Sequence, residues 1–360
     1  MMFVGLLLVM QFACALPSDD AEAEDIGSHG SAVVDGSEAP KKYNFAVAVA
    51  NAYSGICSGT LIAPNLVLTA RQCVIAPSDI PRGGPSGLSC AEATFPEDDL
   101  DPSQLFVTAS VEAKPNGRSK FYFVKKVFTP TERAWCGNDI ALLELEGGIP
   151  ASEAQPATPV VRFSLSDPSK VGRTVTAVGY GRTNPAEKDA GIRRIRADVE
   201  ILCIPGDESY DCDPAVDQRE FVTDGYVCAG ADSGSGPYQV TPDDGTMYVL
   251  GVLSRTDTNC RNGVYTRTDA HGELIIAAGL EAAAEGGYQT PRWAVPDVNG
   301  NGCGGEDCAP KIVQRRVTQG CSAMPRAASP STFDWLALAG VALVLRRRKR
   351  GGRSTTMTDR

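Results

Sequence analysis

The sequence predicts an all-β domain that is stabilised by disulfides and followed by one helix. Short β-branched and leucine-rich runs are separated by turn residues at brief intervals, and no helical segments alternate with them. Many short strands of this kind are typical of all-β barrels. The chain has 360 residues and twelve cysteines, which favours an oxidised, exported protein over one kept in a reducing compartment.

The clearest strand pattern is GTLIAPNLVLT, an apolar run that Pro64 and Asn65 break into a hairpin. The same combination of apolar, β-branched residues between turn residues recurs along the chain. It predicts further strands at residues 45–50, 105–112, 121–127, 140–145, 174–179, 197–201, 247–253 and 263–267.

Residues 269–285 change to an alanine-rich pattern with leucine and isoleucine at helical spacing. This predicts a helix that Asp269 caps and that Gly286 and Gly287 end. His271 lies in its first turn, where we expect a surface residue. Neither this histidine nor the chain's other one lies near a motif that needs a catalytic base.

The formal charge is −10, but the last fifteen residues carry seven Arg or Lys against one Asp. Subtracting this +6 leaves −16 for the rest of the chain. Binding of a nucleic acid requires a basic footprint, and none exists outside the tail. We therefore expect no nucleic-acid partner.

The amino-terminal residues 1–15 form an apolar run that ends in Ala13-Cys14-Ala15, which predicts a signal peptide removed by signal peptidase. Lipidation of Cys14 is the alternative. Residues 16–31 are rich in Asp and Glu and are expected to be a disordered mature or pro segment.

Two motifs carry a family resemblance. The first is Thr69-Ala70-Arg71-Gln72-Cys73, and the second is GNDIALLEL, which contains Asp139. Together they resemble the chymotrypsin/trypsin family of serine peptidases, over about residues 32–285. The resemblance implies two six-stranded antiparallel β-barrels with a carboxy-terminal helix.

In that family the position of Gln72 is a histidine that acts as general base, and the position of Asp139 is the buried carboxylate that orients it. An imidazole exchanges protons near neutral pH, whereas a carboxamide does not. Gln72 is therefore not a competent base, although Asp139 is able to accept a hydrogen bond from its amide.

The nucleophile segment ADSGSGP is one residue longer than the family's GDSGGP, and three alignments stay open. The preferred one makes Ser233 the nucleophile, with Asp232 placed to pair with a new amino terminus. The N–H groups of Ala231 and Ser233 then form the oxyanion hole. The second alignment puts Gly234 in the serine position, and the third has the motif deleted after Cys228.

By the same resemblance, Ser254 supports the aspartate and begins the substrate-binding strand, and Gly263 begins the wall of the specificity pocket. Thr256 stands at the pocket entrance and indicates restricted depth. Val33 and Val34 match the family's activation site, where they would become a new amino terminus, although an edge strand is an equal alternative.

The resemblance and the cysteine spacing favour five disulfides as expectations, since ten cysteines allow many connectivities. They are Cys57–Cys73, Cys90–Cys136, Cys203–Cys212, Cys228–Cys260 and Cys303–Cys308.

Residues 286–320 form a Pro- and Gly-rich linker. Asp297, Asn299 and Asn301 match the start of a calcium loop, but a turn closed by Cys303–Cys308 is preferred, so we expect neither metal nor cofactor.

Residues 321–350 combine Cys321, an apolar run at 333–345 and an arginine cluster. The pattern resembles a myxosortase-type sorting signal. It implies membrane contact before processing, attachment through Cys321 and a mature protein on the cell surface or released from it; the sorting machinery would be a partner. A plain tail anchor is the alternative.

Three functions follow as hypotheses. The first is an exported, surface-attached peptidase homologue that has lost proteolysis and keeps a cleft for a protein or peptide ligand. The second is an active serine endopeptidase that uses Ser233 with an atypical base. The third is a structural surface module.

Overall fold

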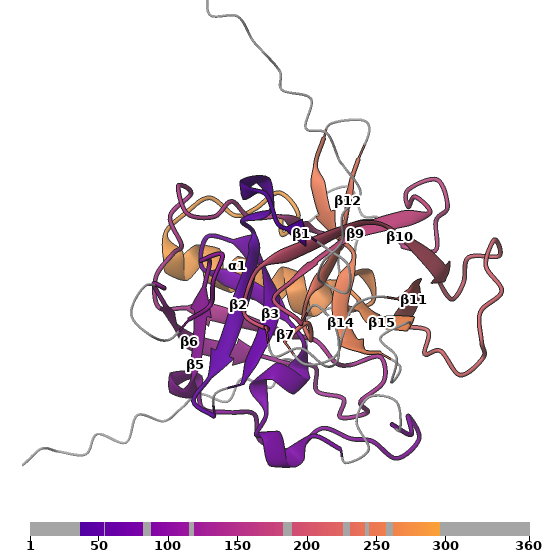
Figure 1. The fold of residues 1–360 in the computed structure, drawn as a ribbon, viewed down its shortest axis with the longest axis horizontal. Coiled ribbons are helices and arrows are strands. Elements are labelled where there is room, and N and C mark those ends of the chain that lie inside the picture. Colours follow the sequence, from indigo (N-terminus) through magenta and orange to yellow (C-terminus); the bar gives the residue numbers. More distant parts are fainter. Residues whose placement is uncertain are drawn as a thin grey trace, which may run out of the picture. The chain divides into compact units, whose positions relative to one another are not determined.

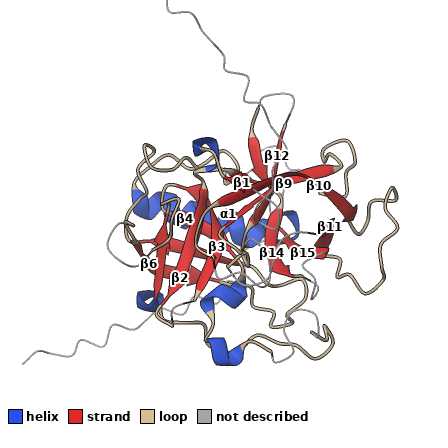
Figure 2. Ribbon diagram, viewed as in Figure 1, coloured by secondary structure: helices blue, strands red, loops and turns tan. Residues whose placement is uncertain are grey.

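The computed structural model describes residues 37–53, 55–81, 88–114, 119–182, 189–225, 231–241, 245–256 and 262–295. Within them the chain is built from strands, short 3₁₀ helices and one α-helix (Figures 1 and 2). Several predicted features lie outside the described residues: the signal peptide, the activation site at Val33 and Val34, the calcium loop and the tail with Cys321.

The first half of the domain is a closed six-stranded barrel with the order β2-β3-β4-β7-β6-β5, all antiparallel. Its strands are β2 (Ala46–Asn51), β3 (Ile56–Ala63), β4 (Leu66–Thr69), β5 (Leu105–Thr108), β6 (Tyr122–Phe128) and β7 (Ala141–Leu145). The β3–β4 hairpin turns at Pro64 and Asn65, as the sequence predicts.

The second half is a sheet with the order β14-β15-β11-β10-β9-β12-β13-β8, and β1 pairs with β10 at the side. Its strands are β1 (Ser37–Glu38), β8 (Thr158–Pro159), β9 (Thr174–Gly179), β10 (Arg194–Cys203), β11 (Glu220–Asp224), β12 (Gly236–Val240), β13 (Met247–Val249), β14 (Gly251–Arg255) and β15 (Asn262–Arg267).

Strands β12 and β14 bring the second six-stranded barrel together. Leu253 N donates to Ser235 O at 2.9 Å, and Gly234 N donates to Leu253 O at 2.8 Å. These backbone bonds lie just outside the regular ladder and join the two ends of the sequence β14-β15-β11-β10-β9-β12. The described fold is the all-β, two-barrel architecture that the sequence predicts.

The described strands differ from the sequence prediction at several places. The strand expected at 247–253 is divided into β13 and β14, because Leu250 N leaves the ladder to bond Pro237 O at 3.0 Å. Strand β5 ends at Thr108 rather than at residue 112. Strands β11 and β12 were not predicted, since charged residues, Gly and Pro within them mask the strand pattern.

Strands β4 and β7 of the first barrel are buried along their whole length because both of their faces are covered. In β7, Leu143 and Leu145 point into the barrel, while Leu142 packs against α1 (Gly272–Gly286) and Trp293 in a second core. The period-two alternation of side chains along the strand therefore sets which core each residue joins.

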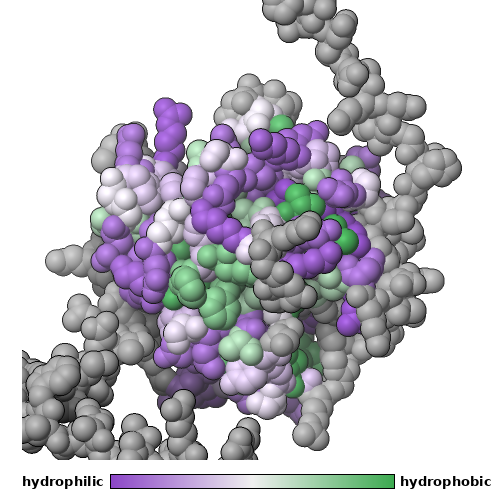
Figure 3. Space-filling view, turned by 60° about the vertical axis from the view of Figure 1, so that its left-hand side comes forward, coloured by the Kyte–Doolittle hydropathy of each residue, from purple (hydrophilic) through white to green (hydrophobic). Residues whose placement is uncertain are grey.

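The molecular face that Figure 3 turns forward carries mostly hydrophilic residues, with an apolar area between them.

The carboxy-terminal helix is confirmed, and so is its end, since Gly287 has φ 65° in the left-handed conformation. Its predicted cap is wrong: the Asp269 carboxylate accepts from Leu165 N at 2.8 Å and pairs with Arg267. The surface position predicted for His271 is also wrong. The ring is buried with Nε2 2.7 Å from Gly137 O, and burial holds the pKa of His271 below its usual range.

Three disulfides lie within the described residues, and all three are pairings that the sequence favours: Cys57–Cys73, Cys90–Cys136 and Cys203–Cys212. The pairs expected for Cys228 with Cys260 and for Cys303 with Cys308 lie outside the described residues.

The fit of Trp293 against the helix predicts opposite effects for two Gly→Ala changes in α1. A Cβ at Gly279 would overlap the Trp293 ring, whereas one at Gly272 would come no nearer than 3.5 Å to Val161 O. We expect Gly279→Ala to lower the free energy of unfolding by about 1–3 kcal/mol, because crowding outweighs helix propensity. The matched control Gly272→Ala should be neutral or stabilising. Urea unfolding checks this, and equal effects of the two changes would contradict the packing account.

Candidate active site

The loop that carries Gln72 follows β4 and is held through the residues on either side of Gln72. It is a 3₁₀ turn over Arg71–Val74, and Cys73 is bonded to Cys57 on β3. Arg71 is 4% exposed; its guanidinium donates to Pro130 O and Glu132 O at 3.1 and 3.0 Å and lies 4.7 Å from the Phe95 ring centroid. The position of Gln72 is thus set by the backbone and by its two neighbours.

Gln72, Asp139 and Ser254 come together where the two barrels meet. Gln72 N donates to Asp139 Oδ1 at 2.9 Å, and Gln72 Nε2 donates to Asp139 Oδ2 at 2.8 Å. The Ser254 hydroxyl also donates to Oδ2, at 2.7 Å, and Gln72 Nε2 donates to the carbonyl of Ser254. The hydrogen bond expected between the Gln72 amide and Asp139 is present.

These partners fix the orientation of the Gln72 carboxamide. A carboxylate oxygen and a backbone carbonyl are both acceptors, so the NH₂ group must face them and Oε1 must point away. Both amide protons are therefore engaged in holding the side chain. The arrangement supports a fixed conformation, and the amide has no proton to exchange near neutral pH.

Asp139 is fully buried, and this burial raises the pKa of Asp139 to about 6. The hydrogen bonds from Gln72 and Ser254 oppose the rise, because they stabilise the ionised form. The carboxylate has no cationic partner among its hydrogen-bond donors. At neutral pH it is held ionised by neutral donors.

The serine-containing segment lies against the Gln72 loop and against β3. Ser58 N donates to Ser233 O at 2.8 Å, and Cys73 Sγ lies 3.6 Å from the same carbonyl. The next residue, Gly234, has φ 83°, and a Cβ there would overlap Ser58 O and Thr69 Oγ1. Gly234 therefore cannot be replaced by a residue with a side chain, which disfavours the alignment that puts the serine position there.

The residues before Ser233 are tied to the rest of the barrel. Ser58 Oγ donates to Ala231 O at 2.7 Å, and Asp232 Oδ1 accepts from Gly181 N at 2.8 Å. Asp232 is fully buried. Its expected partner, a new amino terminus at Val33, lies outside the described residues.

The three residues expected to bind substrate lie on or next to two neighbouring strands, β14 and β15. Ser254 is in β14, Thr256 directly follows that strand, and Gly263 in β15 pairs with Thr223 of β11. Ser254 and Thr256 are 1% and 4% exposed, and Ser233 is 8% exposed. The structure places these residues together, with little contact to solvent.

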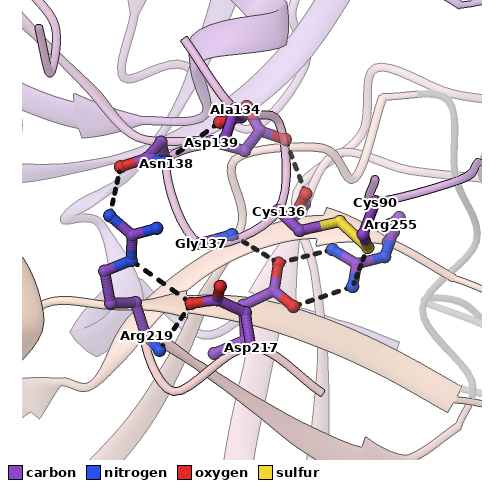
Figure 4. The surroundings of a disulfide bond; sticks show 11 residues. Cys90, Ala134, Cys136, Gly137, Asn138, Asp139, Asp217, Arg219 and Arg255 are labelled. Carbon is purple, nitrogen blue, oxygen red and sulfur yellow. Dashed lines mark hydrogen bonds and ion pairs between the residues drawn. A yellow bond between two sulfur atoms is a disulfide. The ribbon is translucent and has the colours of Figure 1, made fainter. Parts of the chain in front are cut away.

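Sequence reasoning missed an ion pair next to these residues, between the partly buried Arg255 and the fully buried Glu220. Arg255 donates through two nitrogens to the Glu220 carboxylate at 2.5 and 2.7 Å, and Glu220 also accepts from Gly137 N at 2.9 Å. Arg255 touches Cys90 of the Cys90–Cys136 disulfide (Figure 4). The only sequence signal was an arginine directly after an apolar strand run.

Among the described ranges, no group of three or more His, Cys, Asp or Glu residues is arranged to hold a metal ion. A search of the same ranges finds no helix long and apolar enough to cross a membrane.

Comparisons with known proteins agree with this geometry. A family model described as Trypsin matches residues 33–275. The chain belongs to the trypsin family. It is also similar to the CLIP domain-containing serine protease HP8 of Bombyx mori, with 26% identity over 241 residues, which is 61% of this chain and 61% of that protein.

The raised pKa of Asp139 predicts a pH dependence of stability. Between pH 3.8 and about 6 the folded protein binds a proton at Asp139 that the unfolded chain does not, so this contribution to the free energy of unfolding rises as the pH falls. The quantity to compare is the free energy of unfolding of the wild type minus that of Asp139→Asn. We expect this difference to rise by up to about 3 kcal/mol from pH 7 to pH 4. Urea unfolding of both proteins measures it. His271 titrates in both and cancels, and a flat difference would contradict the assignment.

Proposed function

We propose that this chain is an exported trypsin-family homologue that has lost proteolysis and binds a protein or peptide ligand in its cleft. The observation that carries the proposal is Gln72, a carboxamide at the position where the family's motif has its general base. Ser233 is the residue we assign to the nucleophile position, with the N–H groups of Ala231 and Ser233 as the oxyanion hole. Loss of the base alone typically costs about four to six orders of magnitude in turnover.

Within the described part of the chain, neither Asp139 nor His271 is suited to act as a substitute base. Asp139 is fully buried, and both of its oxygens accept hydrogen bonds from Gln72 or Ser254. His271 is buried with Nε2 against Gly137 O, and burial lowers the pKa of His271. An active enzyme would need a base from elsewhere.

The steric argument at Gly234 supports Ser233 as the hydroxyl of this segment that fits the family's serine position. For that reason an active endopeptidase with an atypical base is the second candidate. It differs from the first in predicting that wild-type protein reacts at Ser233 with a fluorophosphonate probe. A structural module without a ligand is the third candidate.

The central test is a peptidase assay of wild type beside Gln72→His. If one lost base explains the loss of proteolysis, the histidine variant should gain at least about 100-fold in kcat/KM, the lower end of what a general base contributes. Peptides that the variant cleaves should bind saturably to the wild type without being cut.

The double variant Gln72→His with Ser233→Ala is the control, and it should return to the wild-type rate. Cleavage by wild type at the rate of Gln72→His, abolished by Ser233→Ala, would overturn the loss of proteolysis. Cleavage by the histidine variant without saturable binding of the same peptides to wild type would remove the ligand-binding part alone.

We further propose that the protein is attached to the cell surface through Cys321 after removal of the residues that follow it. The disulfides of the described domain fit an extracellular protein. The apolar run at 333–345 spans about 20 Å as a helix, short of the roughly 30 Å of a bilayer core, which favours processing over a permanent span.

Mass spectrometry of the protein isolated from its native cells tests this. We expect the wild-type protein to end at or near Cys321. The Cys321→Ala variant should not be processed and should keep the arginine cluster. An intact Arg360 terminus on the mature wild-type protein would contradict the processing.

A further inference from the structure

The Cys90–Cys136 disulfide differs from the other two described disulfides in its exposure. Cys90 is exposed, while Cys136 is buried at 4%. In Cys57–Cys73 and Cys203–Cys212 one residue is buried and the other is only partly exposed. Cys90 is therefore the most exposed cysteine of the three described disulfides, and exposure favours attack by a thiol.

A guanidinium lies directly beside the exposed sulfur. Arg255 Nη2 is 3.8 Å from Cys90 Sγ, and its carboxylate partner Glu220 is fully buried, so the group is held in place (Figure 4). A positively charged donor next to a sulfur attracts an attacking thiolate and stabilises the thiolate that forms when the bond opens. Within the described part of the chain, the sulfurs of Cys57–Cys73 and Cys203–Cys212 make no hydrogen bond to an arginine or a lysine.

The two chain segments stay together without the disulfide. Phe95 N donates to Arg133 O at 2.7 Å, and Trp135 N donates to Ala93 O at 3.0 Å. The rings of Phe95 and Trp135 are stacked with centroids 4.2 Å apart. Because this ladder already closes the long loop, opening the disulfide frees only the few residues beyond it, and the cysteines remain close enough to pair again.

The same disulfide ends at the loop that carries Asp139. After Cys136, Gly137 N donates to Glu220 and the Asn138 side chain accepts from Arg219 at 2.9 Å. Figure 4 shows Arg255 and Arg219 on opposite sides of Gly137. Cys136 therefore lies three residues before Asp139, in a loop whose intervening residues are bonded to the second half of the domain.

From these contacts we propose that Cys90–Cys136 is a reversible thiol–disulfide exchange site whose substrate is a dithiol. A thiolate of the dithiol attacks Cys90 Sγ, the Cys90–Cys136 bond breaks, and Cys136 leaves as a thiolate. The dithiol is now joined to Cys90 through a mixed disulfide. Its second thiol attacks the dithiol sulfur of this bond and releases Cys90 as a thiolate beside Arg255. The reductant is oxidised to its disulfide, and its two protons go to Cys90 and Cys136. The site does not depend on whether the domain cleaves or binds peptides.

The test is timed reduction of the full-length protein with dithiothreitol, followed by alkylation and peptide mapping. We expect Cys90 and Cys136 to be alkylated at least about tenfold faster than the cysteines of the other two described disulfides, with the near-UV circular dichroism retained and the pair restored on reoxidation. Opening of Cys57–Cys73 or Cys203–Cys212 first, or loss of the folded signal as Cys90–Cys136 opens, would overturn the proposal.

Two variants separate the role of Arg255 from loop stability. Arg255→Gln together with Glu220→Gln removes the pair without leaving a buried charge, and it should slow reduction of Cys90–Cys136 at least about threefold. Arg219→Gln is the matched control, since Arg219 holds the same loop without touching the disulfide. Slowing by the control alone, or equal slowing by both, would rule out the part assigned to Arg255.

Discussion

The hydrogen bonds accepted by the buried Asp139 carboxylate determine how the two barrels are arranged at the site. Asp139 follows a turn of the first barrel and accepts hydrogen bonds from Gln72 of that barrel and from Ser254 of the second. A buried carboxylate without such donors would cost several kcal/mol. The Gln72 loop and strand β14 are therefore kept in register with each other, whatever chemistry the site performs.

The same geometry explains how a site can keep its shape after losing a catalytic group. The carboxamide of Gln72 meets the carboxylate and the Ser254 carbonyl with its two N–H donors, so no buried acceptor is left without a partner there. Proton exchange has no such structural substitute. Stability and catalysis at this position thus make different demands, and glutamine meets only the first.

The loop that carries Asp139 is held from the second barrel by groups of several kinds. Glu220 accepts from Gly137 N, His271 bonds Gly137 O, and Arg219 bonds the Asn138 side chain. These residues come from β11, from its preceding turn and from the start of the carboxy-terminal helix. The Cys90–Cys136 disulfide adds the covalent tie within the first half.

The sequence alone determined the all-β class, most strands and the end of the helix, because these depend on local patterns and on short motifs. For the described cysteines it favoured pairings that the structure then confirmed. It also identified Gln72 and Asp139, since both lie in contiguous motifs. The tertiary structure alone decided the burial of His271, the ion pair of Arg255 with Glu220 and the steric exclusion of a side chain at Gly234. Those features arise between segments far apart in the chain, and only the packed barrels bring their atoms within contact distance.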